Sequence, residues 1–432
     1  MGYDSVSSGS DGASTDASIG DDGSVALACG AVGGSLDTSF GSGGSQTLIF
    51  GDLGDFAWAL LRQPDGKLVA SGRTKIGGEF GFAAARLSAD GQPDLSFGGD
   101  GLATAQYNHD FGYSSALQSD GKLLISGDTW NFGRADDYLI TRLHANGTLD
   151  MDFGTNGNVL LNFTSGDSGR SVAVKTGGEI VVAGTAGYTT SNADFAIVQL
   201  DSSGALDPTF GTGGQVRTDF GVGNDSVAGG SRGLHVFASG KIVVAGAAAT
   251  GTLQDFALAQ YTSEGALDLS FDNDGKVVTE LGGNDIPVAL VATQGDTLVV
   301  AGYSTQAAED LLALVKYRAD GSLDESFGDA GVSLTSVPGG GRIHGVVQTS
   351  DGSLMVAGVM GPTGSQDLFL ARFCSDGSLD PMFGTDGFVV EDLNGEDDAA
   401  YDLVLQDDGL AVVLAQSSVA GISRFVLLRY RL

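Results

Sequence analysis

The sequence is poor in the residues that mark several common classes of protein. Its 432 residues include two cysteines, two tryptophans, four histidines and seven prolines. Cys29 and Cys374 are too few for a disulfide framework, and they do not have the spacing of metal ligands. The sequence has no run of 18 or more apolar residues, so it predicts no insertion into a membrane. It also has no Gly-rich phosphate loop followed by Lys-Ser or Lys-Thr.

Basic residues are scarce as well. The chain has 21 basic and 54 acidic residues, a formal charge of −33, which repels phosphate backbones and makes nucleic acid an unsuitable partner. Residues 1–24 are rich in Ser, Gly and Asp, which predicts a flexible acidic tail without the basic start and apolar segment of a secretory signal. We expect an extracellular or cell-surface protein whose signal or anchor is not part of this sequence.

One ten-residue phrase, first found as SLDTSFGSGG at residues 35–44, returns six more times. Its aspartate always precedes its phenylalanine by three positions, and a glycine follows the phenylalanine by four. The phenylalanines are Phe40, Phe97, Phe153, Phe210, Phe271, Phe327 and Phe383, and the aspartates are Asp37, Asp94, Asp150, Asp207, Asp268, Asp324 and Asp380. A period of about 57 residues indicates a repeat architecture.

Each unit contains four short apolar segments bounded by Gly, Asp or Asn, a pattern typical of β-strands. In the first unit they span residues 46–50, 56–62, 67–71 and 82–87. A turn dipeptide such as Asp65-Gly66 joins the second and third, which predicts a tight hairpin. A glycine such as Gly72 usually ends the third, where it suits a strand end or a close backbone approach. The pattern predicts an all-β, seven-bladed β-propeller over residues 25–432, with four antiparallel strands per blade.

Three phrases resemble those of the delta-60 repeat family, a class of bacterial β-propellers. They are GSLDESFGDAG at residues 321–331, QPDGKLVASG at 63–72 and DFALAQY at 255–261, with counterparts in the other units. The resemblance covers about residues 25–432 and implies the propeller fold. It implies no activity, because the family is defined by its repeat and not by a reaction.

The repeated residues are predicted to be structural, because a site that selects a ligand would differ between blades. We expect the phrase to connect the outermost strand of one blade to the innermost strand of the next. Its phenylalanine would fill the seam between blades, and its aspartate would cap the turn. Basic residues late in the fourth segment would pair with these aspartates on an exposed rim. They are Arg86, Arg142, Lys316, Arg372 and Arg429, and Gln199 and Gln260 replace them in two units.

A second set of aspartates lies about ten positions before the hairpin turn: Asp55, Asp110, Asp167, Asp225, Asp285 and Asp398. We expect them near the mouth of a central channel. Single aspartates in such loops usually cap a turn, which is the favoured interpretation. A ring of carboxylates at a pore mouth would instead attract Ca²⁺, the one cofactor that the sequence suggests.

The connections between the third and fourth segments share almost no sequence, which suits binding loops on a rigid scaffold. We expect the phrases and hairpin turns at one end of the propeller and these variable connections at the other. Trp130, Phe132, Val359 and Met360 are the predicted binding residues there. The favoured function is a monomeric, non-enzymatic scaffold that binds a protein or a glycan. The alternative is a hydrolase or lyase with its site in the channel, although no catalytic motif is present.

The ring must also close. Residues 425–430, FVLLRY, match the repeat, and we expect them to complete the seventh blade as its outer strand. Residues 25–29 would then form an added edge strand or remain loose.

Overall fold

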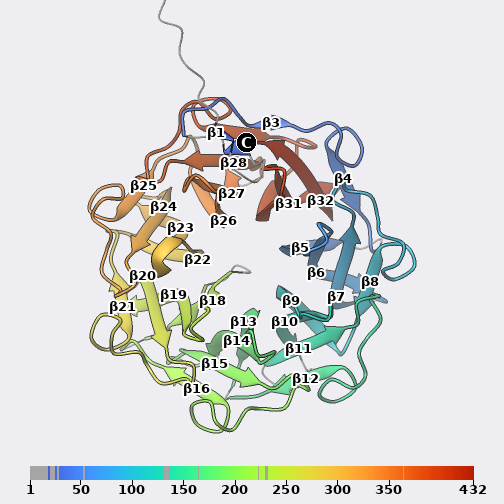
Figure 1. Cartoon of the computed structure of the whole chain (residues 1–432), viewed down its shortest axis with the longest axis vertical. Helices are drawn as coiled ribbons and strands as arrows, with labels where there is room; N and C mark the ends of the chain where they lie inside the picture. The colour runs from blue at the N-terminus through green and yellow to red at the C-terminus, as the bar shows by residue number, and fades with distance from the viewer. Residues whose placement is uncertain are drawn as a thin grey trace, which may run out of the picture.

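The computed structural model describes residues 18–19, 25–26, 29–51, 54–130, 136–163, 165–221, 223–228, 232–362 and 364–432. They form seven antiparallel sheets around a common axis, each with four strand positions from the axis outward. This arrangement confirms the predicted seven-bladed β-propeller (Figure 1). Within these residues the helical content is one 3-10 turn, η1 (Gln294–Asp296). The expected tail at residues 1–24 lies outside the described residues, apart from Ser18–Ile19.

Each blade has four strand layers, and blades are numbered along the chain from the one that contains β5. The innermost strands are β5 (Asp55–Arg62), β9 (His109–Leu117), β13 (Asp167–Val174), β17 (Ser226–Val227) with β18 (Leu234–Val236), β22 (Asn284–Ala292), β26 (Gly341–Gln348) and β30 (Asp398–Leu405). The second strands are β6 (Leu68–Ile76), β10 (Leu123–Trp130), β14 (Ile180–Ala186), β19 (Ile242–Thr250), β23 (Leu298–Gln306), β27 (Leu354–Met360) and β31 (Ala411–Val419).

The two outer layers follow in the same order. The third strands are β7 (Glu79–Leu87), β11 (Asp137–Leu143), β15 (Asp194–Leu200), β20 (Leu253–Tyr261), β24 (Glu309–Tyr317), β28 (Asp367–Phe373) and β32 (Ile422–Arg431). The outermost strands are β8 (Leu102–Ala105), β12 (Asn158–Leu161), β16 (Gln215–Thr218), β21 (Lys276–Thr279), β25 (Val332–Thr335), β29 (Phe388–Glu391) and β4 (Ser45–Leu48).

The LDxSFG phrase connects the third and outermost strands of one blade, so the prediction that it bridges two blades is wrong. In blade 1 it joins β7 to β8, which pair antiparallel with Phe82 opposite Ala105. The phrase turns tightly enough for the chain to reverse and pair with the strand that it has just left. The chain passes to the next blade one strand later, and each unit therefore donates its first strand to the preceding blade.

This shift of one strand decides how the ring closes. In the ring, the blade before blade 1 is blade 7. The first strand of the first unit, β4, therefore pairs with β32 and becomes the outermost strand of blade 7. Residues 425–430 lie in β32, the third strand, and the prediction that they form the outer strand is wrong. The short strand β3 (Ser35–Leu36) pairs with the end of β32. Val25–Ala26 form β2, which pairs with β1 (Ser18–Ile19) outside the blades.

The phrase phenylalanines fill the seams between blades, as predicted. All seven are buried. Phe210 packs with Ile197 of blade 3 and with Val244 of blade 4 in one apolar cluster. Its ring faces the backbone of Gly265, where an added Cβ would approach it to 2.9 Å. Burial of a large ring at every seam is a main source of stability in a repeat protein whose units contact only their neighbours.

The phrase aspartates cap their turns, also as predicted. In all seven copies Oδ1 accepts the backbone N–H two residues further on. The expected basic partners are present, for example Arg372 at 2.7 Å from Asp380. The expectation of an exposed rim is wrong, since both of these side chains are buried. The guanidinium groups of these arginines pack over the rings of the phrase phenylalanines, which shields the arginines from solvent. Arg142, for example, lies 4.3 Å from the ring centroid of Phe153.

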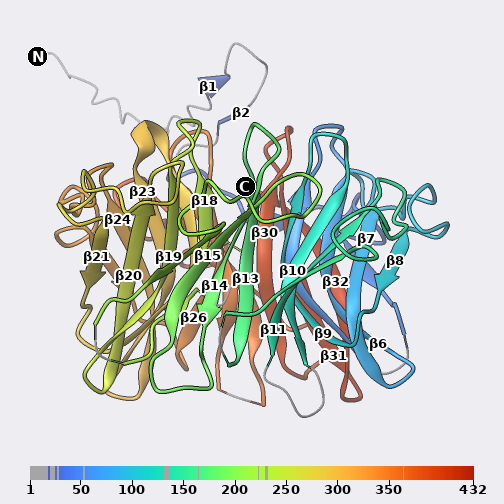
Figure 2. The same cartoon turned by 90° about the horizontal axis from the view of Figure 1, so that it is seen from below.

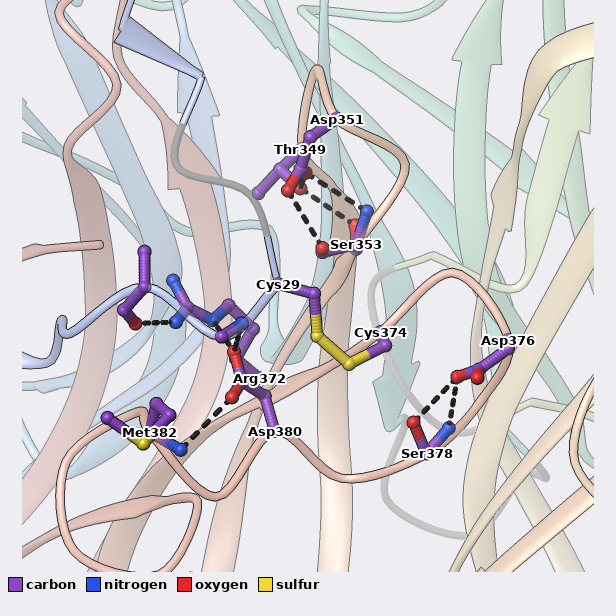
Figure 3. Close-up of a disulfide and its surroundings, with 12 residues drawn as sticks. Cys29, Thr349, Asp351, Ser353, Arg372, Cys374, Asp376, Ser378, Asp380 and Met382 are labelled. Carbon is purple, nitrogen blue, oxygen red and sulfur yellow. Dashed lines mark hydrogen bonds and ion pairs between the residues drawn. A yellow bond between two sulfur atoms is a disulfide. The ribbon is translucent and has the colours of Figure 1, made fainter. Parts of the chain in front are cut away.

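A disulfide between Cys29 and Cys374 fastens the N-terminal segment to blade 6 (Figure 3). The two Cα atoms lie 5.5 Å apart across a sequence separation of 345 residues. Beside it, Gly30 donates its N–H to Asp380, the partner of Arg372. The sequence did not indicate this pairing, because two isolated cysteines carry no spacing signal. The bond joins the segment that precedes β3 and β4 of blade 7 to the neighbouring blade 6.

Strand direction divides the propeller into two faces. Because the strands alternate in direction, the hairpin turns and the LDxSFG phrases share one end, called here the hairpin face. Lys67 of a hairpin turn lies 3.1 Å from Asp94 of a phrase, which agrees with this placement. The variable connections and the crossings between blades share the other end, called the variable face. Figure 2 shows β1 and β2 at the end that carries η1, the hairpin face.

Candidate functional site

The innermost strand carries a β-bulge at the same position in six blades. In β5 the pairing with β6 skips from Ala57 to Ala59, so Trp58 has no partner across the ladder. The extra residue always stands three positions after the first aspartate of the strand or its equivalent. These bulge residues are Trp58, Tyr113, Arg170, Val288, His344 and Tyr401. A bulge bends its strand and changes the direction of the extra side chain, which is why bulges are common beside active sites.

A glycine on the second strand makes room for each of six inner strands. At Gly72 an added Cβ would lie 2.0 Å from the carbonyl oxygen of Phe56. Gly127, Gly184, Gly246, Gly302 and Gly358 repeat this approach, at 1.7 to 2.2 Å. In blade 7, Ala415 takes the place of the glycine, opposite Ala400. The repeated glycine therefore reflects a close backbone approach, one of the two interpretations that the sequence left open.

The bulge residues form an arc of aromatic side chains across neighbouring blades. The ring of Trp58 lies 5.6 Å from Tyr113 of blade 2 and 5.0 Å from Tyr401 of blade 7. Tyr401 stacks on His344 of blade 6 at 5.1 Å. On the other side, the guanidinium of Arg170 in blade 3 lies 4.2 Å from the ring of Tyr113. Five successive blades thus contribute one side chain each to a continuous surface around the axis.

A second aromatic group extends this surface toward the variable face. Arg73 of β6 lies over Phe56, Phe80 and Phe111, with centroid distances of 4.4 to 4.6 Å. His109 contacts both Phe80 and Phe111, at 5.1 and 5.4 Å. It also contacts Trp130, whose side chain is 39% exposed, at 5.7 Å. The predicted binding residue Trp130 is therefore the outer end of an aromatic chain that leads inward.

Below the bulge residues the axis is crossed by Arg232, which comes from the insertion in blade 4. Its Nε donates to Asp402 at 2.8 Å, and its Nη2 donates to the carbonyl oxygens of Leu403 and Leu60 at 3.1 and 3.3 Å. Its own carbonyl oxygen accepts the N–H of Leu290. These contacts join blade 4 to blades 1, 5 and 7. Cavities of about 250 and 480 Å³ both have Arg232 in their walls. Arg232 therefore forms a floor beneath the aromatic arc.

The electrostatics of this site centre on Asp128 of β10. Burial raises the pKa of Asp128 to about 6, against the lowering effect of Arg170. Burial likewise raises the pKa of Tyr113 to about 12, and its hydroxyl forms a hydrogen bond with Asp128. Of the eleven buried side-chain polar atoms that have no hydrogen-bond partner among the described residues, three belong to Asp128 (Oδ1), Arg73 (Nε) and Trp58 (Nε1) of this site. Such atoms are costly to bury and are ready to meet a ligand.

The predicted ring of acidic residues consists of buried caps. In each of the six, Oδ2 accepts a backbone N–H from the crossing that precedes its strand, at 2.7 to 3.1 Å. A second donor often ties the cap to the neighbouring strand, as the hydroxyl of Thr74 does by donating to Oδ1 of Asp55 at 2.6 Å. Burial raises the pKa of four of them: Asp55, Asp110, Asp225 and Asp285.

The calcium hypothesis has little geometric support at this ring. Of the six aspartates, Asp225 alone lies within 4.8 Å of two other carboxylates in the described part of the chain, those of Asp194 and Asp219. Arg217 forms an ion pair with Asp194 in this group. Calcium binding stays a prediction, and the capping hydrogen bonds account for the repeat of these residues.

The other predicted binding residues differ in accessibility. Val359 is buried in β27, so it does not contribute to an exposed apolar patch, and Met360 is half-buried. Phe132 lies outside the described residues. The bulge residues were not among the binding residues predicted from the sequence, which were placed on the variable connections. The sequence does show a variable position at this place in an otherwise repetitive strand. Its residues in the seven units are Trp58, Tyr113, Arg170, Ala228, Val288, His344 and Tyr401.

Comparison with known proteins agrees with the fold. A family model described as a β-propeller domain of unknown function, DUF5122, matches residues 63–97, 118–153, 178–210, 238–271, 294–327 and 349–383. A search of curated proteins finds no match.

Several solved structures match most of the length of this chain. A family PL25 ulvan lyase bound to -[GlcA(1-4)Rha3S]- is 10% identical with a TM-score of 0.51, over 90% of this chain and 96% of the lyase. A glucose dehydrogenase is 13% identical with a TM-score of 0.39, over 89% and 99% of the two chains. Sqt1 from Chaetomium thermophilum is 11% identical with a TM-score of 0.42, over 88% and 97%. In the described residues, no helix is long and apolar enough to cross a membrane. The chain is a seven-bladed β-propeller built of repeats, six of which match the DUF5122 β-propeller domain.

Proposed function

We propose that this protein is an extracellular binding propeller that takes a carbohydrate chain at the variable-face end of its axis. One observation carries the proposal: the arc of Trp58, Tyr113, Tyr401 and His344 on four successive inner strands, above the floor formed by Arg232. Trp and Tyr offer large rigid contact surfaces at a small entropic cost. Ligand sites typically combine such a lining with a few placed polar groups.

The bulge position of the inner strands varies in sequence between blades, which supports a binding role there. The phenylalanine seams and aspartate caps repeat in every blade, as expected of a scaffold. The bulge position changes from blade to blade, so a ligand meets different chemistry in each direction around the axis. A row of aromatic side chains that continues outward to Trp130 suits a chain-like ligand better than the flat surface of a folded protein. We therefore favour a glycan over a protein partner.

The disulfide supports an extracellular location. Disulfides persist in oxidising compartments and are rare in the reducing cytosol. The Cys29–Cys374 bond fastens the N-terminal segment to blade 6, so its formation would stabilise the folded propeller outside the cell.

A second candidate, a lyase or hydrolase in the same channel, is favoured by one observation. Asp128, Tyr113, Arg73 and Arg170 interact with one another electrostatically, and burial raises the pKa of Asp128 toward neutral pH. Acid–base catalysis needs a group of this kind near its working pH. The PL25 lyase shares the fold, which is an analogy of fold and not of site.

The proposal is tested by screening the intact protein against a glycan array and titrating the best ligand calorimetrically. We expect Trp58→Ala to weaken binding about 10-fold or more, since aromatic anchors dominate such contacts. Leu253→Ala is the matched control, because Leu253 is exposed on the variable face of blade 4, away from the arc. Equal affinities of the Trp58→Ala variant and the wild type would refute the site. Appearance of new reducing ends or unsaturated sugars during incubation would favour the enzyme.

A further inference from the structure

The arginines of this protein divide into two groups. Thirteen of them lie in the described part of the chain, and eleven have a carboxylate oxygen at 3.7 Å or less. Arg73 and Arg170 have no such partner among the described residues. In a chain with 54 acidic residues, two arginines that lack an ion pair are an exception that calls for a physical reason.

Both unpaired arginines belong to the site around the axis. Arg170 is the bulge residue of β13, and its guanidinium lies over the ring of Tyr113. Arg73 lies among three phenylalanine rings, and its Nε is buried without a partner. Burial lowers the pKa of Arg73, which reflects the cost of keeping this charge away from water. Cation–π contacts offset part of that cost, although they leave the planar N–H groups of both side chains without an anion.

The nearest acidic group does not neutralise the pair. Asp128 is close enough to interact electrostatically with both arginines, yet it forms no ion pair with either. It is bound instead by the hydroxyl of Tyr113, and its Oδ1 has no partner among the described residues. Asp128 also lies near the carboxylate of Asp136, but neither aspartate forms an ion pair with Arg73 or Arg170 in the described part of the chain. Both guanidinium groups therefore keep N–H groups that are available to an anion from outside the protein.

We propose that Arg73 and Arg170 bind the anionic group of an acidic sugar, while Trp58, Tyr113 and Tyr401 contact its ring. This inference rests on the proposed function and names the class of sugar that the site takes. The planar fork of arginine matches a carboxylate or a sulfate ester, either of which a sugar can carry. Asp128 then lies beside the bound anion, positioned to accept a hydrogen bond from a neighbouring sugar hydroxyl.

The test is a set of calorimetric titrations with three oligosaccharides of matched length: an oligogalacturonate, a sulfated galactan oligosaccharide and a neutral cello-oligosaccharide. We expect the wild-type protein to bind one of the acidic probes more tightly than the neutral one, with an affinity that falls as salt is added. Arg170→Met and Arg73→Met should each weaken the acidic probe about 10- to 100-fold, the value of a hydrogen bond to a charged group. Either change should leave neutral binding within about 2-fold.

Arg342→Met is the matched control. Arg342 is on the inner strand β26 of blade 6 and is already paired with Asp310 at 2.6 Å, so its loss should not change the preference for the acidic probe. Arg170→Lys keeps the charge and loses the fork; we expect partial retention of affinity, and this variant stands in if the methionine variants fail to fold. Preference between the oligogalacturonate and the sulfated probe identifies the anionic group.

The outcomes separate this inference from the proposed function. Equal affinity for acidic and neutral probes, unchanged in the Arg170→Met variant, would overturn the inference and leave carbohydrate binding intact. Failure of every carbohydrate probe and of the glycan array would overturn the proposed function, and the inference with it. Binding of the acidic probe that is equally sensitive to Arg342→Met would show a general charge effect and would also refute the assignment to Arg73 and Arg170.

Discussion

Replacing Phe210 with alanine should cost the protein about 3–5 kcal/mol of unfolding free energy. The side chain is fully buried between blades 3 and 4, so removal of its ring forfeits about 1.5–3 kcal/mol of apolar transfer free energy. The rest comes from the cavity. On one side the ring contacts the bare backbone of Gly265, which has no side chain that could move into the space. The cation–π contact with Lys175, 5.5 Å from the ring centroid, is lost as well.

The assay is urea denaturation followed by far-ultraviolet circular dichroism, in which a lower midpoint at constant slope reports lost stability. Leu269→Ala is the matched control: it removes a large apolar side chain from a phrase of the same type, but Leu269 is 67% exposed. We expect this control to change stability by about 0.5 kcal/mol or less. If Phe210→Ala and Leu269→Ala have the same midpoint, the phenylalanine does not act as a wedge between blades.

Three further predictions test other parts of the account. Cys29→Ser should lower unfolding free energy by about 3–5 kcal/mol because it opens a loop of 345 residues, and the melting temperature of the variant should match that of the reduced wild type; equal melting of oxidised and reduced wild type would refute this. Arg372→Met should lower the free energy of unfolding by about 3–5 kcal/mol, because it leaves Asp380 buried without its ion-pair partner. Arg62→Met should lower it by less than about 1 kcal/mol, because the partner of Arg62 is 82% exposed. Similar denaturation midpoints for the two variants would contradict this difference. Between pH about 4 and 6, folded Asp128 keeps a proton that the unfolded chain releases, so the contribution of Asp128 to stability falls as pH rises. Asp128→Asn should remove that part of the pH dependence of stability, measured by urea titrations at several pH values. An unchanged pH profile would refute the raised pKa.

The sequence was sufficient to predict the blades but not their connection. Strand positions, hairpins, seams and caps each follow from local patterns that recur seven times, so each is supported many times over. The assignment of strands to blades is a different kind of question. A four-strand repeat can be divided at any strand, and residues 45–48 match their repeats equally well in either division. Long-range pairing of β4 with β32 decides it, and no local pattern records that pairing.

The site was harder to predict for a related reason. Asp55 and its equivalents were identified correctly as a repeated feature, but their burial depends on how the crossing folds back over them. The bulge at Trp58 arises from a mismatch between two strands, which neither strand shows alone. Nothing in the sequence distinguishes Arg170, and its lack of an ion pair is evident only because eleven of the other twelve described arginines have an acidic partner.

The central claim, that a carbohydrate binds at the bulge residues around the axis, is tested most directly by a crystal structure of the intact protein soaked with an acidic oligosaccharide. We expect density for a sugar ring against Trp58 and Tyr113, with its anionic group at Arg73 and Arg170 and the chain leading outward past Trp130. Density at the LDxSFG phrases of the hairpin face, or over the outer strands with the axis empty, would contradict it.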